Sequence, residues 1–170
     1  MSNNSKDTNI KEKFKQALQS TFKVISDDFK VDKKDKFIKK SNFPEIESLN
    51  TRSSFVKARA DMDTLALKKR FSDQNIYKKN LPLNLSCKSL YSLTEKIRVE
   101  SLGGKMLKGI QKNFEENYYR IINLKKKHQL ENKDDVSIKE AFELYMLKNF
   151  HDIKLNSLTK KMLSYWEKDF

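Results

Sequence analysis

The chain has 170 residues, 37% of them hydrophobic and 11% aromatic, which is enough apolar side chain to bury a continuous core and argues against disorder of the whole chain. Three glycines and two prolines are few for the many turns of an all-β protein, so the composition favours an all-α fold. The net charge of +13 makes nucleic acid, acidic lipid or an acidic protein surface the candidate partners.

The positive charge is spread along the chain, with an excess of five in residues 1–40, five in 41–119 and three in 120–170. This even spread is typical of a solvated surface and forms no basic arm. The only cysteine, Cys87, has no partner for an internal disulfide, which fits a reducing compartment. The start of the chain lacks the apolar run of a secretion signal, and the longest apolar run is Leu144–Leu147. We therefore expect a cytoplasmic protein without a membrane span.

The first predicted element is a helix over residues 9–26, preceded by a flexible tail at 1–8. Its apolar residues recur at three- and four-residue steps: Ile10, Phe14, Ala17, Leu18, Phe22 and Ile25. Residues 29–40 alternate apolar and charged side chains and then become almost wholly charged, so they predict an irregular connector or a short strand. Residues 42–44 read as a turn.

A second helix is predicted over residues 53–79, ending before the breaker Leu81-Pro82-Leu83-Asn84. Its expected apolar face consists of Phe55, Ala58, Met62, Leu65 and Ala66. A third helix begins near Ser86 and reaches Gly103, with an inward face of Leu90, Leu93 and Ile97. A fourth follows, with an inward face of Met106, Ile110, Phe114, Tyr118 and Ile121.

The last two predicted helices follow a lysine-rich stretch that ends at His128. Ser137 and Glu140 have capping-box spacing, which predicts a helix start at that point. A sixth helix is predicted from Ser157 onward. The sequence therefore predicts about six helices in a single domain over residues 9–170.

All three glycines, Gly103, Gly104 and Gly109, lie within seven residues. A phosphate-binding P-loop would need a preceding strand, a glycine six residues before the lysine, and a hydroxyl residue after the lysine. The residue six before Lys105 is Val99. Here Met106 follows the lysine and the preceding segment reads as helix. We therefore interpret Gly103 and Gly104 as a helix break, and Gly109 as a place where another helix approaches closely.

The two histidines, His128 and His151, are 23 residues apart and have no ligand-like spacing to each other or to Cys87. Zinc and similar ions usually need three or four such ligands, so no metal, catalytic or cofactor site is predicted within the chain, and both histidines are interpreted as solvated. A Cys–His nucleophile pair stays formally open, without any spacing that singles it out.

Four charged residues interleave with the predicted apolar faces: Arg59, Asp61, Arg98 and Glu100. Residues two apart on a helix do not face each other, so neither pair predicts a local salt bridge. We interpret these residues as candidate contacts to another helix or to a partner subunit. The alternative is ordinary surface charge, which contributes little to stability.

Several short runs resemble CobT, a subunit of the aerobic cobaltochelatase, in order and in spacing. The central block is Arg98-Val99-Glu100-Ser101-Leu102-Gly103, followed by Met106, Gly109, Ile110, Asn113, Phe114 and Tyr118. The flanking matches are Phe14 to Leu18, Arg59-Ala60-Asp61 with Ala66-Leu67 and Pro82, Glu140-Ala141, and Lys160-Lys161-Met162 with Trp166. The likeness is to the N-terminal helical region of that family and spans about residues 11–168.

The resemblance implies a non-catalytic assembly subunit of the ligase that inserts cobalt into the corrin ring during cobalamin synthesis. It implies an AAA+ ATPase and a large tetrapyrrole-binding subunit as partners, with ATP, magnesium and cobalt used by the complex. The family continues into an acidic linker and a von Willebrand A-type domain, which we expect to be absent here. Family members often carry Cys-His and a second His where this chain has Phe71-Ser72 and Tyr77.

The rival interpretation is a small basic helical protein that binds nucleic acid. Such a protein would need a positive face with arginine or aromatic contacts to its target. Lysine far outnumbers arginine and no helix-turn-helix is recognisable, so nucleic acid is the weaker prediction.

Overall fold

The computed structural model describes residues 3–27, 49–125 and 130–170. These residues form α-helices and short 3₁₀ turns, and they contain no strand, so the predicted all-α class is confirmed for them. The connector or strand expected near 29–40 and the turn at 42–44 lie outside the described residues. The chain divides into two compact units, Met1–Phe71 and Ser72–Phe170, which are described separately. The single domain over 9–170 stays a prediction.

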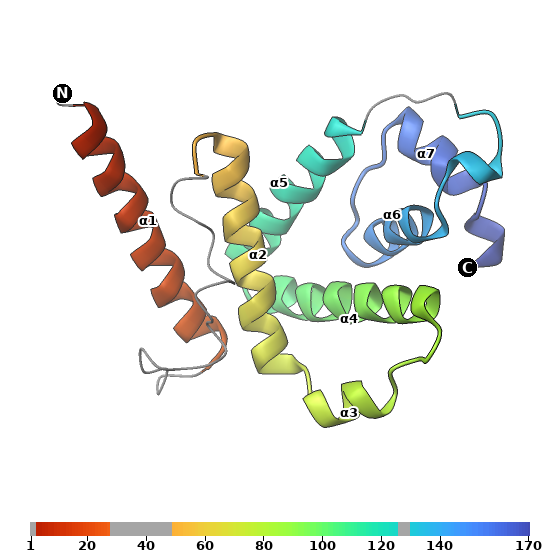
Figure 1. Cartoon of the computed structure of the whole chain (residues 1–170), viewed down its shortest axis with the longest axis horizontal. Helices are drawn as coiled ribbons and strands as arrows, with labels where there is room; N and C mark the ends of the chain where they lie inside the picture. Colours follow the sequence, from red (N-terminus) through yellow and green to blue (C-terminus); the bar gives the residue numbers. More distant parts are fainter. Residues whose placement is uncertain (1–2, 28–48, 126–129) are drawn as a thin grey trace. The chain divides into compact units, whose positions relative to one another are not determined.

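The first unit is a pair of helices, α1 (Asn3–Ile25) and α2 (Arg52–Phe71), that pack against each other (Figure 1). Phe14 meets Phe55 edge to face, with ring centroids 4.9 Å apart. The Arg70 guanidinium donates a hydrogen bond of 3.2 Å to the carbonyl of Ile25, which satisfies a helix-end carbonyl. The helix begins at Asn3, so the predicted tail over 1–8 is wrong for residues 3–8. Polar residues can extend a helix without adding to its apolar periodicity.

The predicted second helix is two helices, because the chain breaks at Ser72 and Asp73. The Asp73 side chain accepts hydrogen bonds from the backbone N–H groups of Asn75 and Ile76 and so starts α3 (Gln74–Lys79). The Ser72 hydroxyl donates a hydrogen bond to Glu95 of the following long helix. The described residues therefore contain seven α-helices, one more than predicted.

In the second unit, α4 (Leu85–Met106) packs against both α5 (Lys108–Leu124) and α6 (Ile138–Phe150) (Figure 1). Asn84 starts α4 by accepting the N–H groups of Ser86 and Cys87. The core between these helices includes Leu93, Ile97, Val99, Ile110, Phe114, Tyr118, Ile122, Leu144 and Leu147. The predicted inward residues Met106 and Ile121 are instead partly exposed: Met106 is the last residue of α4, and the buried stripe of α5 runs through Ile122.

The break between α4 and α5 lies at Leu107, which corrects the prediction of a break at the glycines. Gly103 and Gly104 are buried inside α4, and no described glycine has a positive φ. Leu107 adopts an extended conformation (φ −136°, ψ 112°), and its N–H donates to the Gly103 carbonyl. Such a conformation is open to any residue, so the break needs no glycine. Gly109 has no atom within 4 Å of an added Cβ, so a close helix approach there is also wrong.

The last helices are fixed by caps and by side chains that reach over the C-terminal segment. The Ser137 hydroxyl accepts the N–H of Glu140 and starts α6, as predicted. Asn156 similarly caps α7 (Ser157–Ser164) through the N–H of Thr159. Trp166 donates its indole N–H to the Val136 carbonyl at 3.0 Å. No helix within the described residues is long and apolar enough to cross a membrane.

Candidate functional site

A carboxylate is buried at the centre of the second unit, where α4, α5 and α6 meet. Glu100 on α4 is 1% exposed, and its Oε2 accepts a hydrogen bond of 2.5 Å from the Tyr118 hydroxyl on α5. His151, which ends α6, lies with its Nε2 3.7 Å from the same oxygen. The Lys96 ammonium is 4.0 Å from Oε1. These four residues form a polar cluster, here called the Glu100 cluster: Lys96, Glu100, Tyr118 and His151. The central block of the sequence resemblance contributes Glu100 and Tyr118 to it.

Burial sets the charge state of the histidine in this cluster. The His151 side chain is 6% exposed, and its Nε2 has no hydrogen-bond partner among the described residues. The pKa of His151 is lowered from the ordinary value of 6.5 to about 4, mainly because burial desolvates the ring and also because the Lys96 ammonium lies nearby, while Asp152 opposes the change. His151 is therefore neutral at pH 7. The interpretation of His151 as a solvated histidine is wrong, and His128 lies outside the described residues.

A second polar cluster lies on α4, one turn before Glu100. Glu95 accepts two hydrogen bonds from the Arg98 guanidinium, from Nε at 2.7 Å and from the terminal nitrogen at 2.8 Å, and also one from the Ser72 hydroxyl. The hydrogen bond to Glu95 raises the pKa of Arg98. The Arg98 side chain is still 45% exposed, so it can also meet a partner. Tyr91, one turn before Glu95 on α4, packs beside Tyr77 of α3, with ring centroids 5.2 Å apart.

The charged residues predicted on α2 lie at its exposed face. Arg59 is exposed, and Asp61 forms an ion pair with Lys57 one turn earlier, at 2.5 Å. Asp63, two residues later, is instead buried. An exposed ion pair at i,i+4 contributes only a few tenths of a kcal/mol, so Arg59 and Asp61 stay available for contacts outside the chain.

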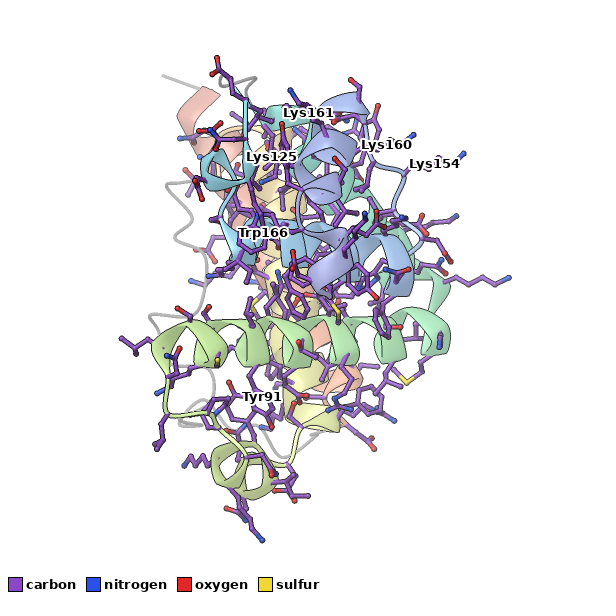
Figure 2. All side chains as sticks on the ribbon, turned by 90° about the vertical axis from the view of Figure 1, so that its right-hand side faces the viewer. Tyr91, Lys125, Lys154, Lys160, Lys161 and Trp166 are labelled. Carbon is purple, nitrogen blue, oxygen red and sulfur yellow. The ribbon has the colours of Figure 1, made fainter. Side chains whose placement is uncertain are left out.

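A basic pocket of about 450 Å³ lies beside α7, between the end of α6 and the C-terminal turn. Its apolar wall consists of Ile153, Leu155 and Leu163, and its rim carries Lys154 and Lys160. Figure 2 shows both lysines extending outward beside α7. Lys161 is engaged differently, since its ammonium donates to the Leu130 carbonyl. The sequence does not predict this pocket, because its lining, although it lies within residues 148–167, forms only when α6, α7 and the segment between them pack together.

Metal-ligating side chains do not gather elsewhere in the described part of the chain. No group of three or more His, Cys, Asp or Glu side chains there could hold a metal ion. Cys87 is exposed and forms no disulfide in the structure.

Comparison with known protein families gives one match, to the family described as cobalamin biosynthesis protein CobT, over residues 8–170. The chain belongs to the CobT family. That membership links it to cobalamin biosynthesis. Neither the curated proteins nor the solved structures contain a significant match.

In this CobT-family chain, the four residues predicted as interface contacts differ in how exposed their side chains are. Arg59, Asp61 and Arg98 have side chains that reach the surface, so their role as interface contacts stays a prediction. Glu100 is buried and joins α4 to α5 within the chain, which is the contact to another helix predicted as one of two alternatives. It does not reach the surface, which the alternative contact to a partner subunit would require. The four residues span both units and are not gathered into one site by any described contact.

One signal in the sequence of this CobT-family chain could have located Glu100 correctly. The buried residues Leu93, Ile97, Glu100 and Gly104 follow one another at spacings of four, three and four, which is the apolar stripe of α4. A carboxylate on that stripe must be buried with a partner. Tyr118 lies on the corresponding stripe of α5, but nothing local in the sequence places His151 beside it.

Proposed function

We propose that this CobT-family chain is a non-catalytic assembly subunit of an ATP-dependent cobaltochelatase, the ligase-type enzyme that inserts cobalt into the corrin ring. The observation that carries the proposal is the family match over nearly the whole chain, residues 8–170. In this proposal, an AAA+ ATPase subunit uses ATP with magnesium, and a large subunit holds the tetrapyrrole. Cobalt is the substrate of the complex.

The use of the buried polar groups supports an assembly role for this chain. Glu100 and Tyr118 satisfy each other between two helices, and His151 is kept neutral by burial. Groups held in this way give the helices a fixed arrangement, since a buried carboxylate is costly to place anywhere else. A fixed helical scaffold with charged residues at its surface suits a protein that positions other subunits.

The exposed candidates for such contacts are Arg59 and Asp61 on α2 and Arg98 on α4. The Arg98 guanidinium is held by Glu95 in a bidentate pair. A pre-oriented guanidinium loses less side-chain entropy when it meets a carboxylate on a partner, which favours arginine at protein interfaces. We therefore expect Arg98 to contribute more binding free energy than an arginine without such support.

The test is direct binding between this chain and the ATPase subunit of the same organism. We expect a complex by size-exclusion chromatography and by pull-down in the presence of ATP and magnesium. If the well-folded chain binds neither the ATPase subunit nor the large subunit, the proposed function is wrong.

A second experiment locates the contact. Arg98→Ala should weaken binding to the ATPase subunit, whereas Arg120→Ala should leave it unchanged. Arg120 is a matched control because it also lies on a helix and has a carboxylate, Glu116, one turn away at 4.0 Å. Circular dichroism checks that both variants fold. Equal binding by the two variants would remove Arg98 from the interface.

A further inference from the structure

The pocket beside α7 combines an apolar wall with cations that lack partners. Ile153, Leu155 and Leu163 supply the wall. Lys154 and Lys160 form no ion pair with any described residue. A cavity of about 450 Å³ lies within the range of ordinary ligand sites, roughly 300–1,000 Å³. Two uncompensated ammonium groups beside an apolar wall select a ligand that carries both negative charge and an apolar group.

A third lysine of the pocket is already neutralised. The Lys148 ammonium lies 2.6 Å from a carboxylate oxygen of Glu167, and both residues line the pocket. The pair is partly exposed, so its own contribution to stability is small. The pair is neutral overall, so Lys154 and Lys160 supply the net positive charge of the pocket.

The backbone at the pocket is suited to an extended ligand. Residues 152–156 lie outside the helices, and the N–H groups of Lys154 and Leu155 donate no hydrogen bond to any described residue. In contrast, the N–H of Ile153 is used, since it donates to the Leu147 carbonyl at 3.2 Å. Free backbone donors in a non-helical segment can pair with the backbone of an added peptide.

We infer that this pocket binds an acidic peptide segment of a protein partner, with an apolar side chain on the Ile153, Leu155 and Leu163 wall and carboxylates on Lys154 and Lys160. The inference rests on the proposed assembly function and assigns it a docking surface. Nucleic acid fits less well, because the wall is aliphatic and the pocket lining offers no aromatic ring for base stacking.

The test uses a fluorescein-labelled peptide, acetyl-Asp-Glu-Leu-Glu-Asp-amide, and the full chain. Binding is measured by fluorescence anisotropy, and the site is located by amide NMR shifts. Three comparison probes separate the sources of affinity: the Asn/Gln form of the peptide, the form with Gly in place of Leu, and a ten-nucleotide oligothymidine. We expect the first peptide to bind most tightly, with shifts centred on Lys154 and Leu155.

Matched variants separate the pocket from the overall charge. Lys154→Glu with Lys160→Glu should weaken binding by about tenfold or more. Lys105→Glu with Lys139→Glu makes the same change in net charge at exposed residues outside the pocket, and should have a much smaller effect. Glu167→Gln should tighten binding, because it removes the rim carboxylate and releases Lys148.

The outcomes are distinct. Equal weakening by the two double variants, or tighter binding of oligothymidine than of the peptide, would overturn the inference. So would equal affinity for the acidic peptide and its Asn/Gln form. If the ATPase subunit or the large subunit binds the wild-type chain and the Lys154→Glu, Lys160→Glu variant equally, the pocket inference fails and the proposed function stands. If neither subunit binds the wild-type chain, the proposed function fails by itself.

Discussion

At the residue scale, the Glu100 cluster shows how an apolar core accommodates ionisable groups. Glu100 is almost completely buried, and a carboxylate without a partner there would carry a large desolvation cost. Tyr118 provides a short hydrogen bond, and its ring also lies 5.3 Å from the Lys96 ammonium. The cluster thereby fixes the relative position of α4 and α5 through directional contacts, in addition to apolar packing.

The Tyr118 hydroxyl is the first group to test. Tyr118→Phe keeps the ring, and with it the contact to Lys96, but removes the hydrogen bond that the hydroxyl donates to Glu100. We expect a loss of about 1–3 kcal/mol in the free energy of unfolding, measured with urea. Tyr119→Phe is the control, because Tyr119 is the next residue and is 66% exposed. A similar small effect for both variants would contradict the structural role of the hydroxyl.

His151 should make stability depend on pH. Its folded pKa of about 4 lies below the ordinary value of 6.5, so the unfolded chain takes up this proton more readily. The associated stability is complete above pH 6.5 and is lost as the pH falls toward 4. As the pH falls from about 7 to about 5, we expect protonation linked to His151 to lower the free energy of unfolding by about 2 kcal/mol. Urea unfolding at both pH values, with His151→Phe for comparison, measures that difference.

An NMR titration of the His151 ring gives a direct check. The groups that face this ring are Lys96 and Glu100 from α4, Tyr118 from α5, and the neighbouring Asp152. We expect no protonation of His151 above pH 5. Protonation near pH 7 would show that the Glu100 carboxylate dominates the site and pairs with an imidazolium ion, which would reverse the predicted pH dependence.

At the element scale, side-chain caps set the helix boundaries and glycines do not. Asp73, Asn84, Ser137 and Asn156 each accept backbone N–H groups at the start of a helix. The one helix start without a side-chain cap among α3 to α7 is that of α5, where Leu107 turns the chain by its extended conformation. The glycines lie on either side of this turn, in helical segments.

Alanine substitution of the glycines distinguishes a hinge from a helix. A Cβ at Gly104 would lie 3.5 Å from Gln111 Cβ, an ordinary contact, and a Cβ at Gly109 would meet no atom within 4 Å. Because both glycines are helical, we expect Gly104→Ala and Gly109→Ala to leave the free energy of unfolding unchanged or to raise it, by up to about 1 kcal/mol. Thermal unfolding is the measurement. Destabilisation by both variants would restore the hinge interpretation.

At the scale of the whole molecule, the net charge of +13 is distributed over both units and over every region of the chain. Several lysines are used locally: Lys125 pairs with Glu140, Lys133 with Asp169 and Lys148 with Glu167. These pairs neutralise individual cations but leave a large overall excess. A long-range positive field of this kind speeds and strengthens association with an acidic partner.

The salt dependence of subunit binding tests this role of the charge. We expect the affinity for the ATPase subunit to fall clearly between about 50 mM and about 500 mM sodium chloride, because salt screens long-range attraction between exposed charges. Sodium sulfate at equal ionic strength controls for specific anion effects. Unchanged affinity across this range would show that the positive charge does not contribute to binding of the ATPase subunit.

The extent of sequence-based prediction can be followed along α4. Its apolar stripe, its start after Asn84 and the helix that follows it are all features of one continuous segment, residues 84–124. The sequence predicts that this helix ends at Gly103, three residues before its end at Met106. Glycine is only one of several residues at which a helix can end, so the glycine pair is a weak signal. The sequence predicts one helix over 53–79, because no proline or glycine interrupts the stretch and the cap at Asp73 is a single polar residue among many.

The sequence by itself determined the all-α class, the approximate helices and the CobT resemblance, since periodicity, caps and motif order are local or linear properties of the chain. Only the tertiary structure decided which charged residues are buried. Arg98 and Glu100 are two residues apart on one helix, yet one reaches the surface and the other lies under α5. The pocket of Lys154 and Lys160 is lined by residues 148–167 alone, but its shape depends on how α6, α7 and the segment between them pack. Burial, pKa and pocket shape depend on what covers a residue, and distant parts of the chain supply that cover.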